Sequence, residues 1–408
     1  MGITQNTRAL LCCIDMSSDQ ATLARLNALP DLDWAGIARE AGRRGVAPLL
    51  YERLRRLSSG IAIPDAVLQT LRRRYLRSAA KNALIYRQLS ALIRTLHEGS
   101  IEVVLLKGAY LAKFVYGNVA LRPMADLDLF VRDTDVGEAG EGLLGAGYTP
   151  HPYNAWYQKN GHYHVAYLPP AGGVNVELHW DIHRWAAGGN GHADGLWRRA
   201  QAIRLDGVDT LGLSAEDLLL HVCLHTCSQH LLSNGLVGLC DFSTIAKRHG
   251  GELQWDEVGW RARQWGVGKP VHMMLRLARE LLGPPVPEKA LRTLEPDGLD
   301  PRAAAWGREI LLADTIGIPP ALPRLRRAER PRDKAIILLR GGLPSPDTML
   351  ATGALQPYSP WIYPRYVVRL VALLRTYGVP LWRMLRGDEA LANLLDNTDA
   401  LREWLGSN

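Results

Sequence analysis

Cysteine is scarce in this sequence, and its few copies lie at positions that do not suggest pairing. The five cysteines are Cys12, Cys13, Cys223, Cys227 and Cys240. Their number is odd and no two of them form a Cys-x-x-Cys motif, which argues against a disulfide framework. We therefore expect a protein that works in a reducing compartment.

Long apolar segments are also missing. No stretch approaches the roughly 20 apolar residues that a helix needs to cross a bilayer. The short apolar run at 9–14 is followed closely by Asp15 and Asp19, and no cleavage site of small residues follows it. These absences predict a soluble, cytoplasmic protein.

Excess charge of either sign is small. Hydrophobic residues make up 47% of the chain and charged residues 22%, which is ordinary for a globular protein and argues against disorder. Lys and Arg total 48 against 41 acidic residues, so the net charge is +7. This excess suits phosphate-bearing ligands or an anionic surface, and it equally suits an arginine-rich protein with neither partner.

The chain of 408 residues is long enough for several regions, and its patterns change along its length. No repeat of fixed period is present. The predicted regions are a helical region at 1–99, an α/β core at 100–188, a helical region at 189–316, an irregular Pro/Arg-rich linker at 317–364 and a helical segment at 365–408.

Apolar periodicity carries these assignments. From Pro64 to about His97, leucines and an isoleucine recur at spacings of three and four, which predicts a helix with one apolar side. The residues on that side are Leu68, Leu71, Leu76, Leu84, Leu89, Leu92, Ile93 and Leu96. Short β-branched or apolar runs predict strands at 101–106 and 126–131, and a hairpin at 162–168 and 174–180. Ser214 resembles the start of a capped helix.

Two aspartates on the second predicted strand are the main candidates for chemistry. Side chains alternate along a strand, so Asp126 and Asp128 project from the same side. Neighbouring carboxylates repel each other unless a cation lies between them, and Mg²⁺ commonly binds one or two carboxylates together with substrate phosphates. An Asp-x-Asp pair is also frequent in ordinary half-exposed strands, so this motif needs support from its neighbours.

Three neighbouring features give that support. Lys107 and Gly108 lie where a strand passes into a helix, where glycine lets a ligand approach the backbone and lysine adds positive charge for a phosphate. Arg122 precedes the aspartates and could reach a phosphate or pair with Asp126. On the later strand Glu177 and His179 share one face, and a carboxylate on an apolar strand is costly unless it is paired or metal-bound.

These motifs resemble those of bacterial nucleotidyltransferase-like proteins of the polymerase-β superfamily. The closest resemblance is to a group associated with exopolysaccharide/exosortase or peptide natural-product gene clusters. The motifs are Leu106-Lys107-Gly108, the run from Leu121 to Leu129, Gly147-Tyr148, and the run from Glu177 to Trp180. The resemblance implies an α+β fold with a small nucleotidyltransferase core, a mixed sheet and helical flanks.

The same resemblance implies metal-dependent nucleotidyl transfer. Asp126 and Asp128 would hold Mg²⁺ or Mn²⁺ against the phosphates of an NTP, and Glu177 would hold a second ion or take the acceptor's proton. Lys107, Gly108, Arg122 and His179 would contact the nucleotide. The acceptor would be a hydroxyl of a small molecule, sugar or peptide. The superfamily usually has Gly-Ser where this chain has Lys107-Gly108, which keeps a second hypothesis open, a binding module that has lost its chemistry.

A third hypothesis rests on histidine. His221, Cys223, His225, Cys227 and His230 crowd one predicted helix, where residues four apart share a face and could chelate zinc. The pattern lacks His-Glu-x-x-His, and packed, hydrogen-bonded histidines explain it as well. In that reading Asp241 would orient His225 or His230.

The C-terminal region mixes arginines with aromatic residues. Arg365, Arg369 and Arg375 alternate there with Tyr363, Tyr366 and Trp382. The pattern is consistent with peripheral contact with a membrane or a protein partner, and also with an ordinary helix whose arginines face water. No nucleic-acid-binding motif accompanies the charge, so we do not expect nucleic acid as a partner.

Overall fold

A seven-stranded mixed sheet lies at the centre of the fold, in the order β3-β4-β5-β2-β1-β7-β6. The computed structural model describes residues 3–159, 161–182, 191–233, 235–313, 321–328, 330–343 and 362–406. The strands in chain order are β1 (Val104–Leu105), β2 (Leu127–Phe130), β3 (Thr149–Pro150), β4 (His164–Leu168), β5 (Val176–His179), β6 (Gln201–Leu205) and β7 (Val208–Gly212). This arrangement confirms the predicted α+β class with a mixed sheet.

The sheet is mixed, because some neighbouring strands run antiparallel and others run parallel. The central strand β2 runs antiparallel to β1 and parallel to β5. The predicted hairpin is present as the antiparallel pair β4 and β5. At the other side β7 runs parallel to β1, and β6 closes this edge as an antiparallel neighbour of β7. All four residues of β2 are buried, as expected for a strand covered on both faces.

The boundary predicted at residue 188 is wrong for the sheet. We expected only helices after that residue, but β6 and β7 complete the sheet with residues 201–212. Their alternation of buried and exposed side chains is that of an edge hairpin, and Gly207 at a φ of 84° allows the tight turn between them. These two strands have only five residues each and lie within a longer helical stretch, so the sequence periodicity did not predict them.

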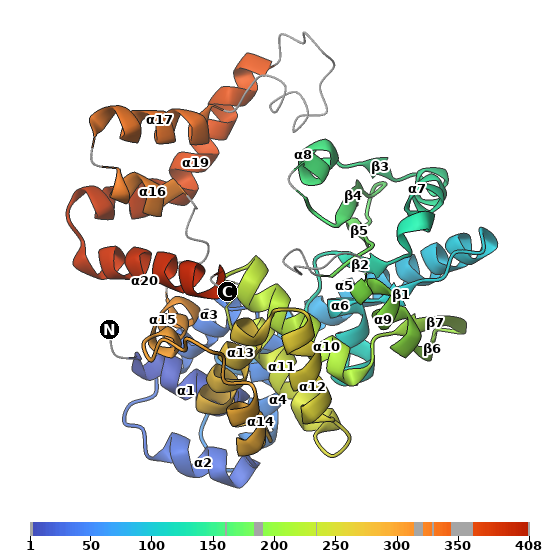
Figure 1. The fold of residues 1–408 in the computed structure, drawn as a ribbon. Coiled ribbons are helices and arrows are strands. Elements are labelled where there is room, and N and C mark those ends of the chain that lie inside the picture. Colours follow the sequence, from blue (N-terminus) through green and yellow to red (C-terminus); the bar gives the residue numbers. More distant parts are fainter. Residues whose placement is uncertain are drawn as a thin grey trace.

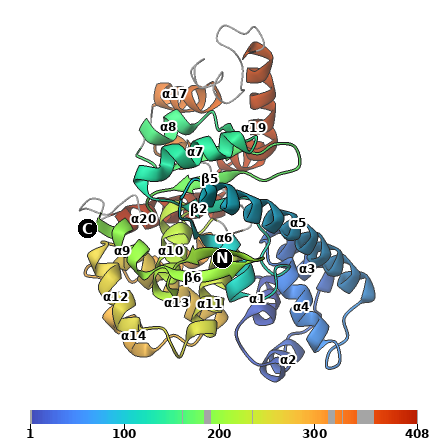
Figure 2. The ribbon, with the colours of Figure 1, turned by 90° about the vertical axis from the view of Figure 1, so that its right-hand side faces the viewer.

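Short helices connect the strands. They are α6 (Lys107–Tyr110), the π-helix η1 (Leu111–Val115), the 3₁₀-helix η2 (Asp133–Asp135), α7 (Val136–Gly145), α8 (Asn154–Lys159) and α9 (Gly191–Arg199). Figure 2 shows α7 and α8 above β2 and β5, with the helices of residues 215–293 below these strands. The central strands are thereby shielded from water.

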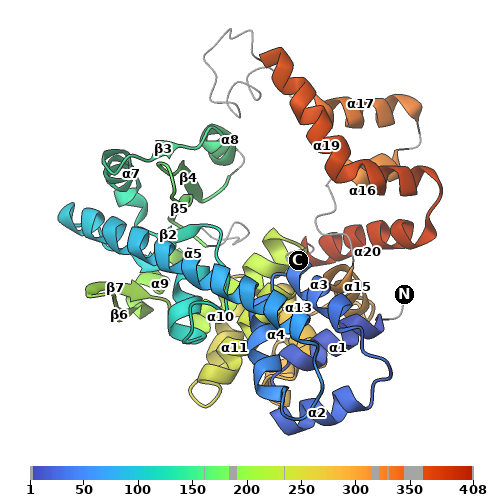
Figure 3. The ribbon, with the colours of Figure 1, turned by 180° about the vertical axis from the view of Figure 1, so that it is seen from behind.

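Five helices precede the sheet, within the region at 1–99 where the sequence predicts helices. They are α1 (Gln5–Ile14), α2 (Asp19–Asn27), α3 (Trp34–Arg43), α4 (Ala47–Leu57) and α5 (Asp65–Glu98). The 34 residues of α5 run from the other four helices to the sheet (Figure 3). Its C-terminal half buries Leu89, Leu92, Ile93 and Leu96 as predicted. Leu76 and Leu84 were expected on the same buried side, but they are 48% and 58% exposed.

Seven further helical segments follow the sheet and share one hydrophobic core with it. They are α10 (Ala215–Leu224), the π-helix η3 (His225–Gln229), α11 (Leu236–His249), α12 (Trp255–Gln264), α13 (Gly268–Leu282), α14 (Glu288–Thr293) and α15 (Ala303–Leu312). Ser214 caps α10 as predicted, because its hydroxyl accepts a hydrogen bond from the Asp217 amide. This single core therefore contains side chains from the helices that precede the sheet in the sequence and from those that follow it.

The last described helices form an arm beside α15 (Figure 1). They are α16 (Ala321–Arg327), α17 (Pro331–Gly342), α19 (Ile362–Leu385) and α20 (Glu389–Gly406). The irregular linker predicted at 317–364 is therefore wrong for 321–327 and 331–342, which are helical. Residues 314–320 and 344–361 of the surrounding stretch lie outside the described residues. Of the helices described, none combines the length and apolar character required to span a membrane.

A buried ion-pair cluster joins the edge of the sheet to the helices below it. The Asp217 carboxylate on α10 is fully buried and accepts hydrogen bonds from Arg199 Nε at 2.7 Å and Arg261 Nη1 at 3.0 Å. Removing one partner from a buried ion pair leaves an uncompensated charge in a medium of low dielectric constant. This contact should therefore be important for stability.

We expect Asp217→Asn to lower the free energy of unfolding by about 3 kcal/mol, because Arg199 loses its buried partner and Arg261 keeps only its longer contacts with Glu216 and Glu257. Asp209→Asn is the matched control, since its side chain is 83% exposed beside Arg204, and we expect a change within about 0.5 kcal/mol. Urea denaturation followed by circular dichroism measures both. Equal effects of the two substitutions would contradict the prediction.

Candidate active site

Two adjacent parallel strands place a pair of carboxylates side by side. In the register of β2 and β5, Asp128 lies opposite Glu177, and the flanking pairs are Leu127 with Val176 and Leu129 with Leu178. The leucines and valine of these pairs are fully buried in the core. Since side chains alternate, the same apolar packing directs Asp128 and Glu177 to the other face. Their proximity, expected from the sequence, is confirmed.

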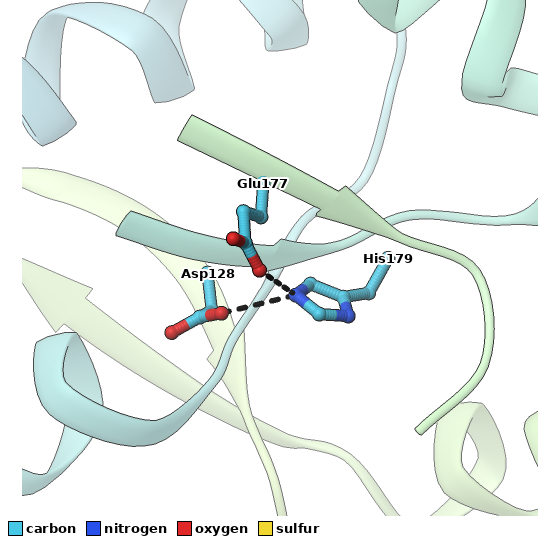
Figure 4. A group of neighbouring side chains, drawn as sticks. All are labelled: Asp128, Glu177 and His179. Carbon is cyan, nitrogen blue, oxygen red and sulfur yellow. Dashed lines mark hydrogen bonds and ion pairs between the residues drawn. The ribbon is translucent and has the colours of Figure 1, made fainter. Parts of the chain in front are cut away.

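His179 bridges the two carboxylates. Its Nε2 atom lies 3.0 Å from Asp128 Oδ1 and 3.3 Å from Glu177 Oε2 (Figure 4). Among the described residues, Asp128, Glu177 and His179 form the one group whose potential metal-ligand atoms lie within 4.8 Å of one another. We expected His179 to contact the nucleotide, and the contacts observed for its side chain are with the two carboxylates.

Lys107 lies against the same carboxylate. Its Nζ atom is 2.7 Å from Asp128 Oδ1, and both side chains are largely buried. The Lys107 backbone has a φ of 37°, in the left-handed region that non-glycine residues seldom adopt. Such strain is found preferentially at functional sites, where the surrounding structure holds it in place. The strained turn thus aims the ammonium group at Asp128.

Gly108 is tightly packed beside this lysine. A Cβ atom at this position would lie 3.2 Å from Met124 Cγ, closer than nearly all real Cβ contacts, so a larger residue would push Met124 aside. We expected glycine here for close approach of a ligand. The packing against Met124 supplies a structural reason for it as well.

Asp126 differs from Asp128 in its surroundings. It lies one residue before β2 and is exposed, whereas Asp128 is only 5% exposed. Two effects raise the pKa of Asp126 above its usual value. The larger is desolvation at the wall of the site, and the second is repulsion from Asp128 and Glu177. Asp126 therefore interacts electrostatically with the other two carboxylates. The three predicted acidic residues therefore interact, although the tightest group contains His179 in place of Asp126.

The charges inside the group are balanced in a definite way. Burial alone would raise the pKa of Asp128, but the Lys107 ammonium and the hydrogen bond from His179 outweigh it and hold this pKa well below the usual range. Burial opposes ionisation of Glu177 too, and the His179 hydrogen bond nevertheless lowers its pKa. Conversely, burial lowers the pKa of His179, while its hydrogen bonds to the two carboxylates raise it overall. The arrangement therefore favours two carboxylates with a protonated imidazole between them.

A cleft of about 490 Å³ opens beside Asp126 and Asp128. Its size is typical of sites for small molecules and nucleotides. Its walls come from four distant parts of the chain: the end of α3 with Arg43 and Arg44, the segment 107–128, the region around η3 and the end of α15 with 310–313. The predicted residues Lys107, Gly108 and Arg122 all line it. Sequence analysis gave no indication of the walls formed by α3 and α15, because they lie far from the motifs.

The contacts of Arg122 correct one prediction. Its guanidinium does not pair with Asp126. Nε and Nη2 bond the carboxylate of Asp241 on α11 at 3.0 to 3.1 Å, and Nη1 donates to the Pro123 carbonyl at 2.7 Å. Asp241 is 3% exposed and needs a buried counter-charge, which explains this pairing. Arg122 thus holds the loop before β2 against α11, and it also lines the cleft.

The same pairing corrects the role expected for Asp241, which orients neither His225 nor His230. Those two histidines contact each other, with 3.1 Å between their Nε2 atoms, and both line the cleft. They lie at a strained segment, because η3 is a π-helix and the next residues Leu231 and Leu232 have φ angles of 45° and 62°.

Zinc binding by this segment gains no support. Cys223 and Cys227 are fully buried, and burial raises the pKa of both thiols, which disfavours the thiolate form that binds metal. Within the described residues, the histidines and cysteines at 221–230 form no group of three ligands.

The donor atoms at the carboxylates fit a hard divalent cation. Asp126, Asp128 and Glu177 offer carboxylate oxygens, which Mg²⁺ and Mn²⁺ prefer. His179 Nε2 lies within hydrogen-bond distance of Asp128 and near Glu177, and these contacts raise its pKa. Lys107 occupies Asp128 Oδ1 and would compete with a cation there.

The two neighbouring histidines His179 and His164 should titrate far apart. Their rings lie 5.1 Å apart, yet burial and the positive charge of His179 lower the pKa of His164 to about 4, while hydrogen bonding raises that of His179 above its usual value. Titration of ring signals by NMR measures both. Glu177→Gln should lower the pKa of His179 by removing one ionic acceptor, whereas Glu102→Gln, at an exposed site paired with Arg132, should leave it unchanged. A pKa of His179 below its ordinary value would contradict the geometry.

Comparison with known proteins agrees with this site. The model of a family described as uncharacterised nucleotidyltransferases matches residues 30–283, which is well over half of the chain. No curated protein and no solved structure matches the chain. The matched stretch contains the three carboxylates, Lys107, and the cleft walls formed by α3 and η3. The chain belongs to this family of uncharacterised nucleotidyltransferases.

Proposed function

We propose that the protein is a Mg²⁺- or Mn²⁺-dependent nucleotidyltransferase that moves a nucleoside monophosphate from an NTP to a hydroxyl group. The observation that carries the proposal is the register of β2 and β5, which brings Glu177 beside Asp128. Asp128 and Asp126 line the cleft. The acceptor classes are small molecules, sugars and peptides, and the sugar and peptide classes rest on the sequence resemblance alone. The five free thiols are consistent with a cytoplasmic reaction.

In the proposed reaction, the acceptor oxygen forms a bond to the α-phosphorus of the NTP, and the bond from that phosphorus to the β-phosphate oxygen breaks. Pyrophosphate leaves, and the hydroxyl proton passes to a base. A bound divalent cation neutralises the phosphates and the oxygens that attack and leave. Asp126 and Asp128 would hold the cation. Glu177 would act as a third ligand or as the base, and both roles require the ionised carboxylate that its lowered pKa favours.

Positive side chains of the cleft suit the triphosphate. Lys107 is the nearest to the carboxylates and would exchange its contact with Asp128 for a phosphate when a cation binds. Arg43 is exposed at the wall formed by α3, while Arg44 and Arg122 are held by Glu40 and Asp241 and contribute charge from fixed positions. Fixed charges stabilise a transition state without reorganising, which is the main protein contribution to phosphoryl-type transfer.

The Lys107–Asp128 ion pair also favours a second candidate function, nucleotide binding without transfer. The Lys107 ammonium group, 2.7 Å from Asp128, balances the charge of this buried carboxylate without a divalent metal cation. If this pair persists with nucleotide present, the cleft would bind an NTP but lack the metal geometry for chemistry. Release of pyrophosphate separates the two candidates.

Substitution of the aspartates tests the transferase directly. We expect Asp126→Asn and Asp128→Asn each to reduce Mg²⁺- or Mn²⁺-dependent pyrophosphate release by roughly 100-fold or more, because charge stabilisation by the cation amounts to several kcal/mol. The assay uses the four NTPs with panels of sugars, peptides and small alcohols. Asp133→Asn is the matched control, since this exposed aspartate lies just past the other end of β2.

Three outcomes are distinguishable in this assay. Loss in both site variants with normal release by Asp133→Asn supports the transferase. NTP binding by the parent without pyrophosphate from any panel supports the binding module. Turnover by the site variants at the rate of the parent would refute the proposed role of the carboxylates.

Protons should compete with the cation at this site. The pKa of Asp126 is raised, so this carboxylate takes up a proton at a higher pH than an ordinary aspartate does. We expect the apparent affinity for Mn²⁺ to fall as pH decreases from about 7.5 to about 5, with proton release on binding. Isothermal titration calorimetry in two buffers of different ionisation enthalpy measures both quantities. Tighter binding of Mn²⁺ at the lower pH would contradict this prediction and exclude Asp126 as a ligand of the cation.

A further inference from the structure

Helix α19 leaves most of its circumference exposed, although it is strongly apolar. Among the described residues, α19 packs against α17 and α20, and Leu381 and Met384 contact the small cluster of Leu322, Leu391 and Leu395. On the remaining surface, large side chains face solvent. We call this surface the α19 face and define it by Val367 (61% exposed), Val368 (66%), Val371 (42%), Leu374 (65%), Val379 (67%) and Trp382 (54%).

Such a face is unusual for a water-soluble helix. Scattered apolar residues are normal on protein surfaces, but a contiguous patch marks an interaction site. At 100° per residue the six side chains span about 140° of the helix circumference. The neighbouring helix α17 and the residue that follows it also expose Leu339 and Leu343, by 57% and 46%. Figure 1 shows the two helices in the same arm, away from the sheet.

The charge of α19 indicates the kind of partner. The helix contains four arginines, Arg365, Arg369, Arg375 and Arg383, and no lysine or acidic residue. Arg365 and Arg375 are exposed. Tyr363 is 74% exposed near one end of the helix, and Trp382 lies near the other. By helical geometry Arg365, Arg369 and Arg383 lie beside the α19 face, whereas Arg375 projects from within it, between Val368 and Trp382. Exposed apolar side chains together with arginines, with aromatic residues near both ends, are the composition of helices that lie in a membrane interface.

We propose that the α19 face binds the surface of an anionic lipid bilayer, with the helix lying parallel to the membrane. The arginines are spread along the whole helix, so a spanning orientation would bury several of them in hydrocarbon at high cost. Lying flat, the helix places its valines and leucine among the acyl chains and its arginines at the phosphates. A second copy of this chain fits less well, because two α19 faces would bring together the exposed Arg365 and Arg375 of both copies, and α19 itself contains no acidic residue. The inference is independent of the proposed transferase.

Vesicle co-sedimentation of the full chain tests the proposal. The probes are vesicles of phosphatidylcholine alone and of phosphatidylcholine mixed with phosphatidylglycerol. We expect at least about tenfold stronger binding to the anionic vesicles, since each arginine near an anionic surface contributes to attraction, and a marked loss at high salt. Val367→Asp combined with Leu374→Asp should reduce binding about tenfold or more, and so should Arg365→Glu combined with Arg375→Glu.

Matched controls use exposed leucines elsewhere. Leu76→Asp combined with Leu84→Asp, on the exposed side of α5, should leave vesicle binding unchanged. All substituted residues face solvent, so each variant should keep the thermal unfolding midpoint of the parent, which circular dichroism checks. Equal binding to both kinds of vesicle, or normal binding by the α19 variants, would overturn the proposal. A dimer in size-exclusion chromatography that these variants dissociate, without vesicle binding, would assign the face to a second copy instead.

Discussion

Repulsion among neighbouring carboxylates is the constraint around which the centre of this molecule is organised. Parallel pairing of β2 with β5 forces Asp128 and Glu177 together, and Asp126 adds a third negative charge nearby. A protein tolerates such crowding only when positive charge is close at hand. Here Lys107 and His179 supply it, one from a strained turn and the other from the same strand as Glu177. Folding and function therefore depend on the same few atoms.

The surrounding structure keeps those atoms in register. Apolar side chains on the opposite face of β2 and β5 are fully buried, which prevents either strand from slipping by one residue. The loop before β2 is tied to α11 through Arg122 and Asp241. Helices from both ends of the matched region share one core with the sheet. Preorganisation of this kind is what electrostatic catalysis of phosphoryl transfer requires.

Much of the site could be predicted because its chemistry is local in sequence. Alternation on short strands was enough to place Asp126, Asp128, Glu177 and His179 on one face, and the predicted hairpin is present. The partner of Arg122 could not be predicted, because Asp241 lies more than a hundred residues away and its burial is a tertiary property. The short strands β6 and β7 could not be predicted from the periodicity. Leu76 and Leu84 lie about 140° around α5 from Leu71 and Leu89, so they belong to the solvent-exposed side of the helix.

The distribution of the cleft walls has a consequence for how this protein is divided. Arg43 at the end of α3 and Ile310 at the end of α15 face the same space as Asp126, and Arg44 holds the two helix ends together through hydrogen bonds to the carbonyls of Leu311 and Leu312. An excised fragment limited to the strands that carry the carboxylates would lose two sides of its cavity and the edge hairpin of its sheet. Recognition of whatever enters the cleft is thus a property of the assembled chain, and the helical flanks are part of the site.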